Sequence, residues 1–196
     1  MFDEVYDKSL KELPNLCQGR EEARIVCNRI IDLKPHLLME IGTGEGGSHR
    51  LWMDAAPDGA EIILIDVEHF LSKVDFWRQW YKPNQKSVFF CDSLKRETRN
   101  RVLAYLQGRK LDFLFIDGDH HYESVKSDFE WYGSLVRVGG LICVHDTHFS
   151  RWPEFGDTVA EWWKEFAATH KTEEVFIEDH HDNTRGIMGT GMYVVE

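Results

Sequence analysis

The sequence predicts an α/β fold: a doubly wound, mostly parallel sheet of seven strands with an antiparallel last strand. Short, continuous apolar runs alternate with stretches of helical periodicity, which is typical of strands covered by helices on both faces. The last two apolar runs have no helix between them, which predicts antiparallel pairing at one edge. The 196 residues contain no repeat or linker, so we expect one domain over residues 1–196, with a helical segment at 1–34 and the α/β core at 36–196.

The first elements lie on either side of a glycine-rich turn. Residues 21–33 carry apolar side chains at three- and four-residue spacing and stop before Pro35, which predicts a helix. The apolar run 36–41 predicts the first strand. The glycine-rich run 42–47 ends that strand, and a second helix is expected from about Ser48.

The remaining elements continue this alternation as far as a fifth strand. Strands are expected over residues 61–65, 87–91, 111–116 and 141–144, and helices over residues 97–106, 125–135 and about 157–168. Gly139 and Gly140 are expected to turn the chain into the fifth strand. The runs 174–177 and 191–195 then form the antiparallel pair.

The charge balance excludes partners that need a basic surface. The chain has 23 Lys and Arg against 34 Asp and Glu, a formal net charge of −11, so binding to nucleic acid or to an anionic membrane has no electrostatic support. There is no apolar run of roughly 20 residues and no signal-peptide pattern. Four cysteines without a C-x-x-C pair indicate reduced thiols. We therefore expect a cytoplasmic protein with a small-molecule partner, and leave open whether it forms a homo-oligomer.

Polar residues end most of the expected strands. In an open α/β sheet, ligands bind outside the carboxyl ends of the strands, so these residues should gather along one crevice. They are Glu45, Asp66, Asp92, Asp117, Asp119, His120 and Asp146.

The glycine-rich turn is the first candidate for ligand binding. It fits Gly-x-Gly-x-x-Gly at Gly42, Gly44 and Gly47, a spacing that lets backbone approach a ligand closely and that also occurs in purely structural turns. Asp66 ends the next strand and favours a nucleoside-bearing cofactor, because a carboxylate there can bind both hydroxyls of a ribose. Glu68 is an alternative for the same contact.

Acidic side chains at this turn favour S-adenosylmethionine (SAM) over a dinucleotide. Glu40 precedes the turn and Glu45 lies inside it, whereas a pyrophosphate is best bound at a helix N-terminus free of acids. SAM has no phosphate, and it carries ammonium and sulfonium charges that such acids would offset. A nicotinamide-dependent oxidoreductase stays an alternative because of the Gly-x-Gly-x-x-Gly spacing.

Together these segments resemble the class I SAM-dependent methyltransferases. Residues 40–46 are similar to the first motif of that family, Asp66 to its ribose-binding acid, and residues 91–94 to the segment beside the adenine. The resemblance covers about residues 36–195 and implies a Rossmann-like fold with a reversed last strand. The candidate cofactor-binding residues are Glu40, Gly42, Gly44, Asp66, Asp92, Ser93 and Asp117.

Residues 115–122 and 139–146 resemble the metal-dependent O-methyltransferases, in particular the macrocin-type sugar O-methyltransferases and the family named after cephalosporin hydroxylase. The resemblance implies that Asp117 and Asp146 bind Mg²⁺ and that His120, three residues after Asp117, is the general base. It further implies metal-assisted O-methylation of a small-molecule hydroxyl, such as one on a sugar or another natural product.

His145 departs from this pattern, because the position before Asp146 is usually acidic in the resembling enzymes. Imidazole suits Mn²⁺, Fe²⁺ or Zn²⁺ better than Mg²⁺. Three interpretations are open: His145 is a third ligand of a softer ion, it is not a ligand, or the site is vestigial. Asp119 or Thr147 could supply an oxygen instead. The departure also leaves a non-catalytic binding or assembly protein as an alternative.

Other polar residues have plainer structural interpretations. Asp119 is a candidate cap for the helix that follows it. His148, Arg151 and Trp152 follow the fifth strand, where a substrate lid and an ordinary surface loop are both consistent with the sequence. The run 180–182 contains two histidines and an aspartate, and is expected to be a polar turn rather than a metal site.

Overall fold

The computed structural model of the chain describes residues 2–12, 16, 18–67, 74–148, 158–176 and 189–196. Within these residues seven strands form one sheet, in the order β3-β2-β1-β4-β5-β7-β6. The strands are β1 (Leu37–Ile41), β2 (Glu61–Ile65), β3 (Lys86–Phe90), β4 (Leu111–Ile116), β5 (Val136–His145), β6 (Thr172–Val175) and β7 (Thr190–Val194). β7 pairs antiparallel with β5 and β6, and the other pairings are parallel. The predicted fold class is confirmed, including the reversed last strand.

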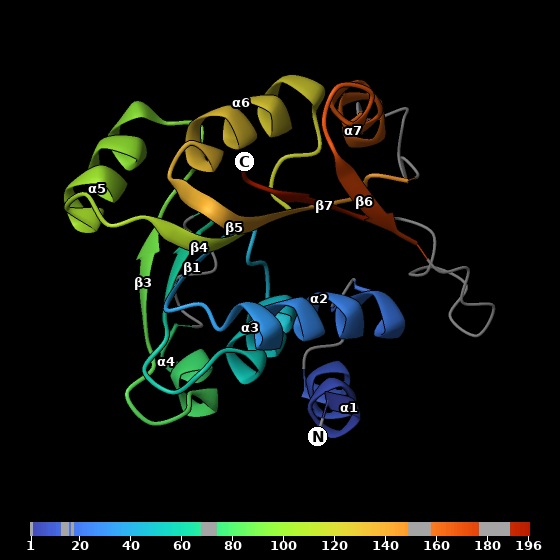
Figure 1. Cartoon of the computed structure of the whole chain (residues 1–196). Coiled ribbons are helices and arrows are strands. Elements are labelled where there is room, and N and C mark those ends of the chain that lie inside the picture. Colours follow the sequence, from blue (N-terminus) through green and yellow to red (C-terminus); the bar gives the residue numbers. More distant parts are fainter. Residues whose placement is uncertain (1, 13–15, 17, 68–73, 149–157, 177–188) are drawn as a thin grey trace.

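Helices cover both faces of the sheet (Figure 1). α1, α2, α3 and α4 lie on one face, and α5, α6 and α7 lie on the other. Their bounds are α1 (Phe2–Glu12), α2 (Arg20–Leu33), α3 (Gly47–Ala55), α4 (Val74–Trp77), α5 (Arg96–Leu106), α6 (Tyr122–Gly133) and α7 (Val159–Ala167), and a 3-10 turn, η2 (Arg78–Trp80), follows α4. This is the doubly wound arrangement that the alternating runs predict.

A hydrophobic core lies on each face of the sheet. Each central strand contributes side chains to both cores, because successive side chains of a strand point to opposite faces. In β1, Leu38 packs with α2 and α3, whereas Met39 packs with the helices of the other face. All five residues of β1 and of β2 are buried. Continuous burial explains why these strands appear in the sequence as unbroken apolar runs rather than as alternating ones.

The element boundaries differ from expectation where β5 begins. The strand starts at Val136 rather than at residue 141, and the pairing jumps from Leu111 with Val136 to Phe113 with Leu141. Gly139 and Gly140 therefore lie in an irregularity inside the strand and not in a turn before it. Gly139 has a φ of +74°, which an L side chain rarely adopts, so the irregularity needs glycine there.

The described cysteines are unpaired, as predicted. Cys27 and Cys143 are buried, and burial raises the pKa of both thiols, whereas Cys91 is half-buried. Cys17 lies outside the described residues. Among the helices of the described segments, none combines the length and the apolar character that crossing a membrane requires.

Candidate active site

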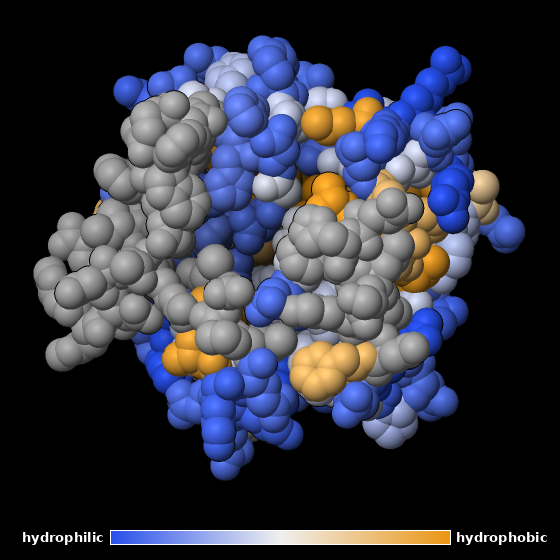
Figure 2. All heavy atoms as spheres, turned by 180° about the vertical axis from the view of Figure 1, so that it is seen from behind, coloured by the Kyte–Doolittle hydropathy of each residue, from blue (hydrophilic) through white to orange (hydrophobic). Residues whose placement is uncertain are grey.

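The carboxyl ends of the parallel strands surround a cavity of about 450 Å³. On the face shown in Figure 2, hydrophilic side chains predominate around a hollow near the centre of the view. The predicted site residues that line the cavity are Gly42, Gly44, Asp66, Asp92, Ser93, Asp117, His120, His145 and Asp146. The polar ends of successive strands are thus brought together at one edge, as expected for this class of sheet.

The glycine-rich turn presents bare backbone to the cavity. Gly42 has a φ of +85°, and a Cβ added there would lie 1.7 Å from the carbonyl oxygen of Asp117. Trp77 holds the turn in place, because its Nε1 donates a hydrogen bond to the carbonyl oxygen of Glu45 at 2.8 Å. It is fixed from β2 by the carbonyl oxygen of Ile65, which accepts from the Gly42 amide at 2.8 Å. Only glycine fits at position 42, because a side chain there would collide with the end of β4.

Asp66 bridges the end of β2 and the glycine-rich turn. Its Oδ2 accepts a hydrogen bond from the Gly44 amide at 2.6 Å, and its Oδ1 accepts from the Val67 amide at 2.6 Å. Both carboxylate oxygens therefore stand at the cavity wall with fixed orientations. The alternative ribose acid, Glu68, lies outside the described residues.

Asp92 and Ser93 lie on the side of the cavity next to β3. Asp92 has a φ of +34°, and its Oδ1 accepts from the Leu94 amide at 3.1 Å. The Ser93 hydroxyl donates to Oδ2 of Asp128 at 2.9 Å. Burial raises the pKa of Asp128 to about 7, and Oδ1 of this residue has no hydrogen-bond partner. Ser93 is thus held in place by a buried acid that the sequence reasoning did not single out.

Glu40 lies behind the cavity wall rather than on it. Its side chain is fully buried, and its Oε1 accepts from Nε1 of Trp52 at 3.0 Å. Burial raises the pKa of Glu40 to about 8, so the carboxyl is largely protonated at neutral pH. From this position Glu40 contacts Ser48 and Trp52 of α3, the helix that follows the glycine-rich run.

Two carboxylates and two imidazoles meet at the other end of the cavity. Nε2 of His120 lies 3.7 Å from Oδ1 of Asp117 and 3.2 Å from Oδ2 of Asp146. Nδ1 of His145 lies 3.4 Å from Oδ1 of Asp117 and 3.3 Å from Oδ1 of Asp146. The potential ligand atoms of Asp117, His120 and Asp146 lie within 4.8 Å of one another, close enough for one metal ion to contact all three.

Burial differs within this cluster. His145 and Asp146 are almost fully buried, whereas the His120 side chain is 32% exposed and faces the cavity. Burial alone would lower the pKa of His145, but Asp146 and Asp117 raise it well above its ordinary value. Burial alone would raise the pKa of Asp117, but His145 and His120 bring it below its ordinary value. Asp146 has a φ of +60°, so its side chain is aimed by an uncommon backbone conformation.

Gln18 and Glu22 also reach this cluster from the start of α2, and sequence reasoning missed both. Nε2 of Gln18 donates to Oδ2 of Asp117 at 3.0 Å, and Oε1 of Glu22 lies 3.6 Å from Nε2 of His145. A signal for Glu22 existed. It shares the buried face of α2 with Val26 at i+4, so it is a charged residue inside an apolar stripe. No comparable pattern marks Gln18.

The structure tests some of the structural roles that the sequence suggests for the remaining polar residues. Asp119 is not the N-cap of α6, because His121 occupies that position. Asp119 instead accepts from the Ser124 hydroxyl and contacts Nδ1 of His121 at 2.6 Å. His148 is exposed and stacks on Phe176. Arg151, Trp152 and the run 180–182 lie outside the described residues.

Comparison with known proteins gives both family and structural matches. Residues 39–147 match the protein family described as "Methyltransferase domain". A curated relative, the uncharacterized protein y4gI of Sinorhizobium fredii, is 30% identical over 145 residues, which cover 69% of this chain and 15% of that protein. The uncharacterized protein R132 of Acanthamoeba polyphaga mimivirus is 48% identical over 42 residues, 21% of this chain and 19% of that protein. The matched segments therefore cover less than a fifth of the length of either curated relative.

Solved structures resemble the whole fold. An O-methyltransferase from Bacillus cereus in complex with SAH matches with a TM-score of 0.66 and 18% identity, over 100% of this chain and 90% of that one. The O-methyltransferase TomG from Streptomyces achromogenes, in complex with SAM, matches with a TM-score of 0.63 and 17% identity, over 100% of this chain and 89% of that one. The MycE methyltransferase of the mycinamycin pathway, in complex with Mg, SAH and mycinamycin VI, matches with a TM-score of 0.63 and 18% identity. The match covers 99% of this chain and 54% of that one. At these identities the likeness concerns the fold alone.

Proposed function

The chain belongs to the methyltransferase-domain family, and from this premise we propose that it transfers a methyl group from SAM to a hydroxyl group of a small molecule. One observation carries the proposal. The cavity has a glycine-rich turn and Asp66 at one end and the cluster of Asp117, His120 and Asp146 at the other. A nucleoside-bearing methyl donor and an acceptor hydroxyl each find suitable groups along this single cavity.

The residues of the turn fit SAM better than they fit a dinucleotide. A Cβ added at Gly44 would meet nothing within 4 Å, so the turn leaves room for a ligand there, and the Asp66 carboxylate stands where it can accept hydrogen bonds from two ribose hydroxyls. Glu45 lines the cavity beside the turn. An acid there disfavours a pyrophosphate and favours a cationic ligand. Asp92 and Ser93 supply polar groups for the adenine.

The buried group of Asp117, Asp146 and His145 also fits a divalent metal ion. Nδ1 of His145 and Oδ1 of Asp146 are buried without a hydrogen-bond partner, and each is within 3.4 Å of another potential ligand. We propose that Asp117, Asp146 and His145 hold the ion. When bound, a divalent cation lowers the pKa of an acceptor hydroxyl and orients it.

His120 is the residue best placed to take the acceptor's proton. It lines the cavity, is about one-third exposed, and its Nε2 lies 3.2 Å from Oδ2 of Asp146. That contact orients the ring while leaving it open to the cavity. A general base must be within hydrogen-bond reach of the proton it removes, and a hydroxyl placed beside Asp117 would meet this condition.

The acceptor is proposed to be a neutral or cationic small molecule, because the net charge of −11 disfavours nucleic acids and anionic membranes. The cytoplasmic location and the association of copies of the chain stay predictions.

Isothermal titration calorimetry with SAM tests the cofactor. We expect the wild type to bind SAM and to bind NAD much more weakly. The variant Asp66→Ala should lose about 2–3 kcal/mol of binding energy, roughly 30- to 150-fold in Kd, because two charge-assisted hydrogen bonds disappear. Asp58→Ala is the matched control, since Asp58 is an exposed acid in a turn away from the cavity. Absence of SAM binding by the wild type, or equal affinities of the two variants, would disprove the cofactor assignment.

A second measurement tests the base. SAH release is followed with a panel of sugar and phenolic acceptors, using the wild type and His120→Ala. The variant should keep its SAM affinity and lose turnover by roughly 100-fold or more. Unchanged turnover in the variant would remove His120 from the chemistry.

A further inference from the structure

We propose that Gln18 and Glu22 are positioning residues for a metal centre formed by Asp117, Asp146 and His145, and that this centre prefers an imidazole-binding transition metal ion to Mg²⁺. The inference rests on the proposed function, in which a divalent ion acts at this end of the cavity. It adds two residues from the N-terminal helical segment and a class of metal.

Glu22 faces the nitrogen of His145 that points away from the two aspartates. Nδ1 of His145 lies within 3.4 Å of both Asp117 and Asp146, and Nε2 lies 3.6 Å from Oε1 of Glu22. A histidine that binds a metal through one ring nitrogen commonly has a carboxylate at the other, which fixes the tautomer and the ring orientation. Glu22 places a carboxyl group on that side of His145, at a distance longer than a hydrogen bond, so that Nε2 has no hydrogen-bond partner. Nδ1, which faces the two aspartates, is the proposed ligand atom.

Glu22 is itself held in place. Its Oε1 accepts a hydrogen bond from the hydroxyl of Thr190 on β7, and its side chain is only 2% exposed. A buried carboxylate on a helix is costly unless it is paired, so its place between Thr190 and His145 calls for a specific role.

The buried groups around His145 leave bonding capacity unsatisfied. Asp117, Asp146 and Glu22 place three carboxyl groups around one imidazole, each with an oxygen within 3.6 Å of a ring nitrogen. Both ring nitrogens of His145 and Oδ1 of Asp146 are buried and have no hydrogen-bond partner. Ligands about 2.1 Å from one ion lie about 3 Å apart when adjacent, close to the observed separations.

Gln18 fixes a second member of the centre. Its Nε2 donates to Oδ2 of Asp117 at 3.0 Å, which leaves Oδ1 of that aspartate on the side of His145 and His120. The backbone carbonyl of Gln18 accepts from the Tyr6 hydroxyl at 2.7 Å, so α1 holds the segment that carries Gln18.

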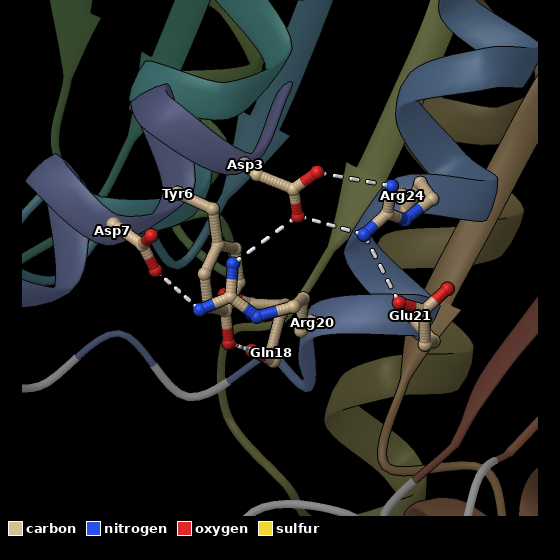
Figure 3. A network of polar contacts seen from close by, with 7 residues as sticks. All are labelled: Asp3, Tyr6, Asp7, Gln18, Arg20, Glu21 and Arg24. Carbon is tan, nitrogen blue, oxygen red and sulfur yellow. Dashed lines mark hydrogen bonds and ion pairs between the residues drawn. The ribbon is translucent and has the colours of Figure 1, made fainter. Parts of the chain in front are cut away.

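The two N-terminal helices are joined by a network around these contacts (Figure 3). Arg20 pairs with Asp7 and Asp3, and its guanidinium lies 4.4 Å from the centroid of the Tyr6 ring. Arg24 pairs with Asp3 at 2.7 Å. Exposed ion pairs contribute little singly, but together with the buried Tyr6 hydroxyl they fix the start of α2 relative to α1.

The ligand set indicates the class of metal. Mg²⁺ prefers oxygen donors throughout, whereas one imidazole with two carboxylates suits Mn²⁺, Fe²⁺ or Zn²⁺. The alternative is that His145 remains protonated and acts as a built-in cation in place of a metal. Direct metal binding distinguishes these two cases without reference to turnover.

The test measures Mn²⁺ binding to the EDTA-treated full chain by electron paramagnetic resonance, with Mg²⁺ as competitor. We expect Mn²⁺ to bind at least about tenfold more tightly than Mg²⁺. Glu22→Gln should weaken Mn²⁺ binding by roughly 10- to 100-fold, and Gln18→Leu should weaken it in the same direction. Asp32→Asn is the control, because it removes one exposed acid from the same helix. Should Glu22→Gln fail to fold, Thr190→Val removes the hydroxyl that holds Glu22 and should also weaken binding.

SAM affinity, measured by calorimetry on the same proteins, separates this inference from the proposed function. Glu22→Gln should bind SAM as the wild type does. Mn²⁺ affinity in Glu22→Gln equal to that of Asp32→Asn overturns the positioning role. Preference for Mg²⁺ overturns the assigned class of metal. Absence of divalent binding with SAM binding intact overturns the metal centre and favours the built-in cation. If the wild type does not bind SAM, the proposed function itself is refuted.

Discussion

Replacing Gly42 with alanine tests the close approach between the glycine-rich turn and the end of β4. The added Cβ would lie 1.7 Å from the carbonyl oxygen of Asp117 and 2.7 Å from the amide nitrogen of Gly118. Relief requires β1 and β4 to separate by more than about 1 Å, against the hydrogen bond from the Asp117 amide to the Ile41 carbonyl. Gly44→Ala is the matched variant, because its φ of +51° is also positive but its Cβ meets nothing within 4 Å.

The two variants should differ in a predictable amount. A left-handed conformation costs an alanine about 1 kcal/mol, and this is the whole expected effect of Gly44→Ala on the free energy of unfolding. Gly42→Ala should lose about 2–5 kcal/mol, because strain from overpacking adds to the same conformational cost. It should also weaken SAM binding, since the turn and Asp117 move together.

Equilibrium urea unfolding of both variants, with SAM titration of the folded proteins, measures these quantities. If Gly42→Ala is less stable than Gly44→Ala by under about 1 kcal/mol, the two strand ends are not in contact as described.

Two further substitutions test the support beneath the cavity. Burial raises the pKa of Glu40 from its usual 4.5 to about 8, so the stability that its protonated form provides is complete below about pH 4.5 and is lost as the pH rises through 8. Glu40→Gln should therefore show a flatter unfolding free energy between about pH 5 and pH 9 than the wild type, and identical pH profiles would contradict the burial argument. Trp77→Phe removes the hydrogen bond to the Glu45 carbonyl and should cost about 1 kcal/mol of stability and weaken SAM binding roughly three- to tenfold, as measured by calorimetry. An unchanged affinity would mean that the turn keeps its shape without this contact.

Much of the sheet was predictable because its strands are buried on both faces. β2 and β4 begin and end where predicted, since unbroken apolar runs meet polar residues or turns at both ends. β5 was predicted too short, because Val136 and Leu141 are separated by two glycines that resemble a turn. Glycine is typical of both a backbone irregularity inside a strand and a turn, so only the pairing with β4 distinguishes them.

The candidate site was predictable to the extent that it lies at strand ends. Asp66, Asp117 and Asp146 line one cavity because parallel strands bring their carboxyl ends to the same edge. Gln18 was not predictable, since its partner Asp117 lies 99 positions away and helical periodicity carries no information on that contact. Glu22 was detectable only as an acid on an apolar face, with no indication of its partner.

The sequence by itself therefore determined the class of sheet, the edge where the cavity lies and the acids that gather there. These follow from local hydrophobic pattern and from the fixed direction of parallel strands. Only the tertiary structure decided that His120 is partly exposed in the cavity while His145 is buried in its wall between three acids. It also decided that Gln18 and Glu22 lie beside Asp117 and His145. Both depend on how α2 packs across the sheet, and packing across long chain separations is set by the whole core rather than by any local pattern.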